Sequence, residues 1–198
     1  SAIDNKNSLN SMDDIITFLT KLKSMYDLNI EKVPLNEIND WEINDYEIFH
    51  KDKLFFKVIA LDVFIENREV TNWSQPMIQP AQEGLCAFIC KKINGILHFL
   101  VQAKLECGNL DIIELAPTVQ CLTGNYKLKN NNIPFLNEIL NIDGKFIYYD
   151  TLQSEEGGRF YKEQNRNMIV VADENFKNDI PDNFIWMTYN QLLRLLRY

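Results

Sequence analysis

The sequence predicts an α+β fold in which a largely antiparallel or mixed sheet is flanked by helices. Three observations support this prediction. Stretches rich in β-branched and aromatic residues alternate with turn signals through the middle of the chain. Amphipathic helical patterns lie near both ends. The composition is that of a globular protein, since 46% of the 198 residues are hydrophobic and 24% are charged.

The first predicted element is a helix over residues 12–26. Ser11 can cap it, acidic residues occupy its first turn, and apolar residues then recur at helical spacing. Residues 29–47 are rich in Asn, Asp and Glu, a composition typical of irregular structure. We therefore divide the chain into an N-terminal arm and helix, 1–40, and a single domain, 41–198.

Strand patterns dominate the centre of the chain. Residues 54–65 and 85–93 are β-rich, and Asn94-Gly95 is the strongest short hairpin signal in the sequence. Period-2 alternation of apolar and polar residues then predicts a strand over 96–106, and residues 111–121 alternate again, with Glu114, Thr118 and Gln120 in a polar row on one face. These segments form the centre of the predicted sheet.

The strand over 96–106 places its polar side chains in one row, because successive side chains point to opposite faces of a sheet. The row contains His98, Gln102, Lys104 and Glu106. Such a row fits either a polar concavity or a sheet face in contact with water. For His98 we expect a structural or solvent role.

The last third of the sequence completes the sheet and adds a second terminal helix. A short helix is expected over 134–141, with strands near 145–150 and 167–172. Thr188 and Gln191 form a capping-box pattern that opens a leucine-rich helix. Helices therefore bracket the predicted sheet at both ends of the chain.

Charge and cysteine usage exclude several classes of protein. A net charge of −8 argues against nucleic-acid binding, which needs a basic surface. No apolar run approaches the ~20 residues that cross a bilayer, and we expect no membrane partner and no secretory leader. The four cysteines lack metal-site spacing and are expected to be reduced thiols of a cytoplasmic protein. No phosphate-loop or dinucleotide motif is present, and no cofactor or metal is expected.

Three residues suit a nucleotide ligand. Arg159 and Arg166 can pair with a diphosphate in bidentate fashion, although nearby glutamates offer ordinary surface ion pairs. Trp73 can stack on a base, although a tryptophan at a strand edge or in a core is equally familiar. These residues alone leave the ligand open.

Taken in order, the polar motifs resemble the nucleotide-diphosphate-hexose 2,3-dehydratases of deoxysugar biosynthesis. The resemblance covers about residues 41–196 and rests on Trp73-Ser74-Gln75-Pro76, Leu100-Val101-Gln102-Ala103-Lys104-x-Glu106-x-Gly108-Asn109, Ala116-Pro117-Thr118-Val119-Gln120, Asn125-Tyr126, Gln153-Ser154-Glu155-x-Gly157-x-Arg159-Phe160, Asn165-Arg166-Asn167-Met168 and Trp186-x-Thr188-x-x-Gln191-Leu192. It implies a fold similar to the Nudix module. The Nudix catalytic box is absent, which disfavours pyrophosphate hydrolysis.

The resemblance implies a reaction on a dTDP-4-keto-6-deoxyhexose. A base removes the C3 proton, which the C4 ketone acidifies, and the C2 hydroxyl then leaves with help from an acid. Lys104 would stabilise the enolate oxygen, with the base and the acid unassigned among three proton carriers. The implied catalytic residues are Lys104, Glu106, Tyr126 and Glu155, and the implied substrate contacts are Trp73, Gln102, Asn109, Gln120, Asn125, Arg159, Asn165 and Arg166.

The sequence departs from the family pattern in three places. Similar enzymes carry two tandem copies of this module and this sequence has one, so we expect two chains to associate as a homodimer. Cys107 stands where the family usually has Pro, and Glu156 where it usually has Gln. Two alternatives stay open: a non-catalytic nucleotide-sugar-binding module or subunit, and an isomerase that uses the same C3 proton abstraction without elimination.

Overall fold

The computed structural model describes residues 7–122, 132–172, 176 and 179–196. Their elements, in chain order, are α1 (Met12–Met25), η1 (Leu35–Glu37), β1 (Trp41–Ile43), β2 (Glu47–His50), β3 (Lys57–Phe64), β4 (Asn72–Gln79), β5 (Gly84–Ile93), β6 (Ile96–Leu105), β7 (Ile113–Ala116), β8 (Val119–Leu122), α2 (Leu136–Leu140), η3 (Gly144–Phe146), β9 (Ile147–Ser154), β10 (Gln164–Val171), β11 (Phe184–Thr188) and α3 (Tyr189–Leu195). The α+β class with flanking helices is confirmed.

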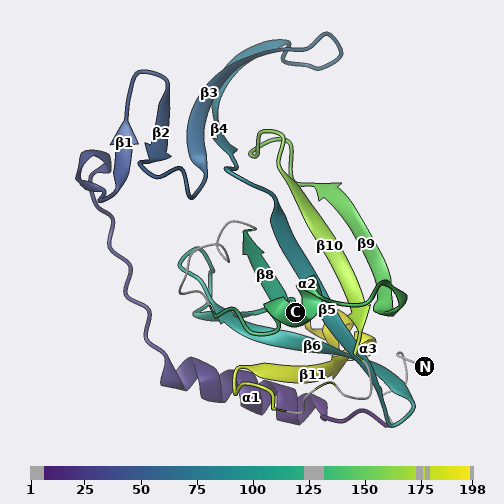
Figure 1. The fold of residues 1–198 in the computed structure, drawn as a ribbon. Helices are drawn as coiled ribbons and strands as arrows, with labels where there is room; N and C mark the ends of the chain where they lie inside the picture. The colour runs from purple at the N-terminus through teal and green to yellow at the C-terminus, as the bar shows by residue number, and fades with distance from the viewer. Residues whose placement is uncertain (1–6, 123–131, 173–175, 177–178, 197–198) are drawn as a thin grey trace.

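The strands form two sheets rather than the single sheet that the sequence suggests. A four-stranded antiparallel sheet has the order β1-β2-β3-β4, and Figure 1 shows its long β3–β4 hairpin reaching away from the rest of the chain. A seven-stranded sheet contains the path β11-β6-β5-β10-β9. Only β10 and β5 pair in parallel among the described strands. The smaller sheet, β1 to β4, therefore lies beside the larger one, and we call it the arm sheet.

The large sheet forks beside its central hairpin. The hairpin turns at Asn94 and Gly95, which adopt positive φ angles of 50° and 81° as the sequence signal requires. β5 and β6 stay paired as far as Ile89 and Leu100, and beyond that point β8 pairs with β5 while β7 pairs with β6. The segment predicted as one strand over 111–121 is therefore two strands inserted between the separating strands.

Thr118 sits at the branch point of the fork. Its buried hydroxyl accepts a hydrogen bond from the Ile89 amide at 2.9 Å and donates one to the Leu100 carbonyl. The side chain thus replaces the ladder bond that the two strands lose as they separate. The expectation that Thr118 belongs to a polar row with Glu114 and Gln120 is wrong for this residue, because the fork buries it.

Helices cover the sheet as predicted. Residues of α1 and α3 pack on one face, around Ile15, Val101 and Met187. α2 packs on the other face against a larger apolar cluster that contains Leu100 and Val119. Both predicted helix caps are present as capping boxes. None of the described helices is long and apolar enough to cross a membrane.

The strands that the sequence reading missed have identifiable physical causes. β4 contains Pro76, which argues against a central strand but is tolerated here because β4 is an edge strand. In the segment expected to be irregular, the Asn44 side chain accepts hydrogen bonds from the amides of Tyr46 and Glu47 and so closes the β1–β2 hairpin. β11 is a five-residue strand whose partner, β6, lies far away in sequence.

Candidate active site

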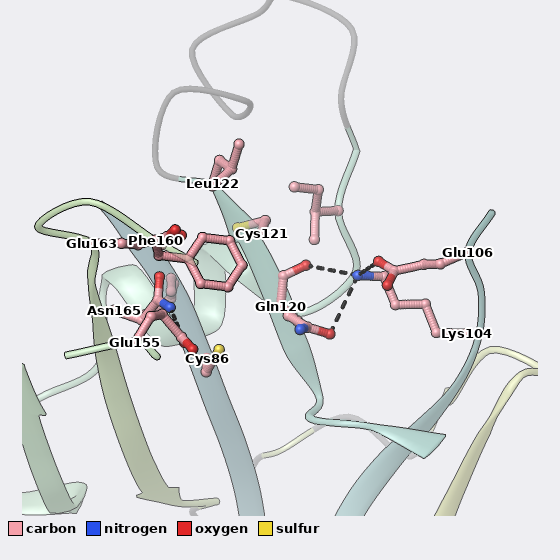
Figure 2. A pocket seen from close by; sticks show the side chains of 13 residues that line it. Cys86, Lys104, Glu106, Gln120, Cys121, Leu122, Glu155, Phe160, Glu163 and Asn165 are labelled. Atoms are coloured by element: carbon pink, nitrogen blue, oxygen red, sulfur yellow. Dashed lines mark hydrogen bonds and ion pairs between the residues drawn. The ribbon is translucent and has the colours of Figure 1, made fainter. Parts of the chain in front are cut away.

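A pocket of about 560 Å³ opens where the large sheet forks. Its lining comes from both branches of the fork, from the segment before α2, from the β9–β10 loop and from β10. It consists of Gly84, Leu85, Cys86, Lys104, Glu106, Gln120, Cys121, Leu122, Ile133, Glu155, Phe160, Glu163 and Asn165. Figure 2 shows two groups of polar side chains facing each other across this space. We call them the lysine wall (Lys104, Glu106 and Gln120) and the carboxylate wall (Glu155, Glu163 and Asn165).

The lysine wall is built by β6 and β8. Lys104 lies past the fork, where β5 no longer covers β6, so its side chain reaches the pocket and is only 24% exposed. Its Nζ forms an ion pair with Glu106 and lies 3.4 Å from both the backbone carbonyl and the side-chain oxygen of Gln120. One carboxylate and two neutral oxygens thereby hold the Lys104 ammonium at the mouth of the pocket.

The carboxylate wall depends on close contact between β10 and β5. The side-chain amide of Asn165 donates a hydrogen bond to the Glu155 carboxylate. Asn165 lies opposite Gly84 in the parallel register, and a Cβ on Gly84 would come within 1.9 Å of the Asn165 side-chain oxygen. Only glycine leaves the space that this asparagine needs. Gly84 therefore allows Asn165 to orient Glu155.

Glu163 is the more enclosed of the two glutamates in the carboxylate wall. It is half-buried, whereas Glu155 is exposed. Burial raises the pKa of Glu163 above its usual range, and the negative charge of Glu155 adds to the rise. From the sequence, Glu163 was only one of the nearby glutamates that could form a surface ion pair with Arg159 or Arg166, because no local pattern distinguishes it.

The β9–β10 loop that carries this wall is held in place by β4. Ile78 forms a parallel bridge with Phe160, its amide donating to the Arg159 carbonyl at 2.9 Å and its carbonyl accepting from the Tyr161 amide at 2.7 Å. Gln75 donates to the Gly158 carbonyl at 2.8 Å. The arm sheet thus positions the loop, and with it one side of the pocket.

The thiols of Cys86 and Cys121 also line the pocket. Burial raises the pKa of both Cys86 and Cys121, while the positive charge of Lys104 opposes the rise in each. The thiols therefore stay protonated at neutral pH and supply small apolar surface between the two walls. All four cysteines of the chain are free.

The structure brings together five of the predicted site residues and separates others. Lys104, Glu106, Gln120, Glu155 and Asn165 line the pocket. Tyr126 and Asn125 lie outside the described residues, so their roles stay predictions. Gln102 lies on the same strand face as Lys104 but beside β11 and β7, outside the pocket lining. Asn109 is in the β6–β7 loop, where its amide donates to the Glu106 carbonyl at 3.2 Å.

The predicted nucleotide contacts are spread over three places. Trp73 lies on β4, where its indole N–H donates to the Gln75 side chain at 2.6 Å, and it lines a separate hollow with Arg68, Glu69 and Val70. Arg159 is next to the pocket residue Phe160, with its guanidinium 5.1 Å from the ring centroid, and pairs with Glu156 at 2.8 Å. Trp73 therefore does not share the pocket with the lysine wall.

Arg166 lies on the opposite face of β10 from Asn165, because neighbouring side chains in a strand alternate. It makes a bidentate pair with Asp150 on β9, at 2.8 and 2.6 Å. The surface ion pair that the sequence left open is thus present, with Asp150 as the partner instead of a loop glutamate. A diphosphate contact by Arg166 stays a prediction.

Three comparisons with known proteins bear on this site. The family described as "NDP-hexose 2,3-dehydratase" matches residues 12–198. A dTDP-4-dehydro-6-deoxy-alpha-D-glucopyranose 2,3-dehydratase of Saccharopolyspora spinosa is 42% identical over 189 residues, covering 94% of this chain and 39% of that protein. The enzyme of the same name from Amycolatopsis orientalis is 38% identical over 186 residues, covering 93% of this chain and 39% of its own length.

The chain therefore spans well under half the length of these curated relatives. Among solved structures, one titled "Crystal structure of ADP compounds hydrolase" aligns with 72% of this chain and 76% of its own, at 14% identity and a TM-score of 0.41. That similarity is too weak to support an argument. In the part of the chain that the structure describes, no group of three or more His, Cys, Asp or Glu side chains is placed to hold a metal ion.

Proposed function

The chain belongs to the NDP-hexose 2,3-dehydratase family, and from that premise we propose that it dehydrates a dTDP-linked 4-keto-6-deoxyhexose across C2 and C3. The single observation that supports this most strongly is the placement of Lys104 across the pocket from two carboxylates. The proposed reaction needs a cation near the C4 oxygen of the developing enolate. It also needs one group that accepts the C3 proton and another that protonates the C2 hydroxyl.

Lys104 supplies the electrostatic stabilisation in this proposal. As the C3 proton leaves, negative charge develops on the C4 oxygen, and the Lys104 ammonium is positioned to receive it as a hydrogen-bond donor. Glu106 and Gln120 hold the ammonium at the pocket mouth. The base that removes the C3 proton comes from the carboxylate wall, where Asn165 orients Glu155.

Arg159 is the proposed diphosphate contact closest to the pocket. It lies beside Phe160 on the loop that borders the carboxylate wall, and its ion pair with Glu156 is exposed and readily exchanged for a phosphate. We further propose a homodimer in the reducing cytoplasm. Its assembly is supported by exposed apolar side chains on the arm sheet, Ile43 and Phe64, and by Val70 in the β3–β4 connection. The free cysteines support its compartment.

The reaction can be tested with dTDP-4-keto-6-deoxyglucose in deuterium oxide. We expect loss of the C2 hydroxyl and deuterium in the dehydrated product, and no reaction with the 4-hydroxy sugar, which cannot form an enolate. Binding of the nucleotide sugar without exchange or elimination would favour the binding-module alternative, and C3 exchange with the C2 hydroxyl retained would favour the isomerase. Light scattering after gel filtration, across micromolar concentrations, tests the dimer.

A further inference from the structure

Glu155 and Glu163 mark the two ends of the loop between β9 and β10. The Glu155 backbone amide donates to the Glu163 backbone carbonyl at 3.0 Å, so the first and last residues of the loop are paired. Both side chains line the pocket, together with Phe160 from the middle of the loop (Figure 2). Two carboxylates therefore approach the same bound molecule from one wall.

The surroundings of the two carboxylates differ. Glu155 is exposed, and the Asn165 amide fixes its orientation. Glu163 is half-buried, with Glu155 as the charged group whose repulsion acts on it. When two carboxylates share a site, the more buried one keeps its proton to higher pH, because burial penalises the charged form most.

We propose that Glu163 is the catalytic acid that protonates the departing C2 hydroxyl, and that Glu155 is the base that removes the C3 proton. This assignment rests on the proposed function. It gives each carboxylate of the pair the role that its surroundings favour. A carboxyl group that holds its proton can donate it, and an oriented, solvent-accessible carboxylate can accept one.

The proposed step balances without any further reactant. The C3–H bond breaks and its proton goes to Glu155, while the electron pair forms the C3–C4 double bond of the enolate, whose oxygen faces Lys104. The C4 carbonyl then re-forms, a C2–C3 double bond appears, and the C2–O bond breaks as Glu163 gives its proton to the hydroxyl, which leaves as water. The product is an enol with its hydroxyl on C3, which becomes the 3,4-diketo sugar by releasing that hydroxyl proton and taking up a proton from solvent at C2. Transfer of the proton from Glu155 to Glu163 restores the starting state.

The test separates proton abstraction from elimination. In deuterium oxide, E163Q should still form the enolate and should return it to substrate with deuterium at C3. Its loss of water should fall by about 10²-fold or more, the usual contribution of a general acid. E155Q should lose both exchange and elimination. E138Q, which alters an exposed glutamate on α2 away from the pocket, serves as the matched control and should behave like the wild type.

Three results would overturn the assignment of roles to Glu163 and Glu155. These are elimination by E163Q at the wild-type rate, equal loss of exchange and elimination in a folded E163Q that still binds dTDP, and persistence of exchange in E155Q. Should E163Q fold poorly, E163D tests the same point. Its shortened acid should slow elimination at least tenfold while C3 exchange continues. A wild-type protein that neither exchanges nor eliminates would refute the proposed function itself, a separate outcome.

Discussion

The two halves of β6 put polar side chains to opposite uses. In the first half, β5 stays paired with β6, and His98 is fully buried, 0% exposed. Its Nε2 accepts a hydrogen bond from the Leu9 amide at 3.0 Å, and its Nδ1 lies 3.0 Å from the Ile96 carbonyl, to which it donates. In the second half the strands have separated, and Lys104 reaches the pocket.

The difference teaches that side-chain alternation assigns a face but not an environment. Both residues occupy the same row of the strand, six positions apart in register, and both were predicted to lie on one polar face. The neighbouring backbone separates their roles. In the first half, β6 stays paired with β5 and the Leu9 amide contacts His98, whereas the fork opens the second half. Breaking either half should therefore affect a different property of the protein.

The largest expected effect is on catalysis in the open half. Lys104→Met should slow dehydration by about 10²–10³-fold, because the enolate oxygen loses its charged donor. The melting midpoint should change little, since the ammonium is at the pocket mouth. Lys92→Met is the matched control, because Lys92 is an exposed lysine on the paired half of β5. Equal rates for the two variants would contradict the role given to Lys104.

In the closed half the expected effect is on stability. His98→Ala should lower the free energy of unfolding by about 3 kcal/mol, because it leaves a cavity and removes the acceptor for the Leu9 amide. Urea unfolding measures the loss. The dehydration rate of the folded fraction should be unchanged. A variant that unfolds normally but has lost activity would place His98 in the chemistry after all.

Thr118 lies at the boundary and tests whether the fork is held by one hydroxyl. Thr118→Val keeps the shape of the side chain but leaves the Ile89 amide and the Leu100 carbonyl without their partner, at a cost of about 2 kcal/mol. Thr118→Ser retains the hydroxyl and should recover most of that stability. If serine and valine are equally destabilising, the methyl group and not the hydrogen bonds holds the branch point.

The smallest expected effect concerns the ion pair on the far face of β10. The hydrogen bond from Arg166 lowers the pKa of Asp150 below its usual range. Their interaction therefore stabilises the fold fully when the pH is above the ordinary carboxyl pKa. This stabilisation is lost as the pH falls through the lowered pKa of Asp150. Arg166→Met should cost about 0.5–1 kcal/mol near pH 6 and less near pH 3, measured by urea unfolding at both values.

Arg166→Met also helps to show which of the two arginines contacts the diphosphate. If Arg159 is the diphosphate contact, Arg159→Ala should remove most of the rise in melting midpoint that dTDP produces, while Arg166→Met keeps it. The reverse result would move the diphosphate site to the far face of β10 and away from the pocket. Equal responses by both variants would place the diphosphate at neither residue.

How much of this could be predicted from sequence depended on the range of the interactions. Helix caps, the Asn94-Gly95 hairpin and the face assigned to Lys104 follow from residues close in the chain, and the structure confirms them. The burial of His98 and the branching at Thr118 depend on distant partners. No local pattern predicts that the Leu9 amide contacts His98 in the first half of β6. Nor does any local pattern predict that β7 pairs with the second half of β6 while β8 pairs with β5.

The carboxylate wall was only partly predicted for the same reason. Glu155 and Asn165 were chosen because they match family motifs, but their contact depends on the parallel pairing of β10 with β5 and on the absence of a side chain at Gly84. Glu163 lies eight residues beyond Glu155, and only the closed loop brings the two together. Arg166 was proposed as a diphosphate contact from a family motif, which does not show that its side chain lies on the opposite face of β10 from Asn165 and pairs with Asp150.

The parallel pairing of β5 with β10 also sets an order for the maturation of the protein. The lysine wall lies within the segment from β5 to β8, whose hairpin and short connections can close early during folding. The carboxylate wall joins it only through a parallel ladder between distant parts of the chain, and such contacts form slowly because a long loop must close first. A newly made chain should therefore form the lysine wall before the carboxylate wall docks beside it. The complete pocket would then form in one of the last steps of folding. A delay in the pairing of β10 with β5 would give compact molecules with an incomplete pocket.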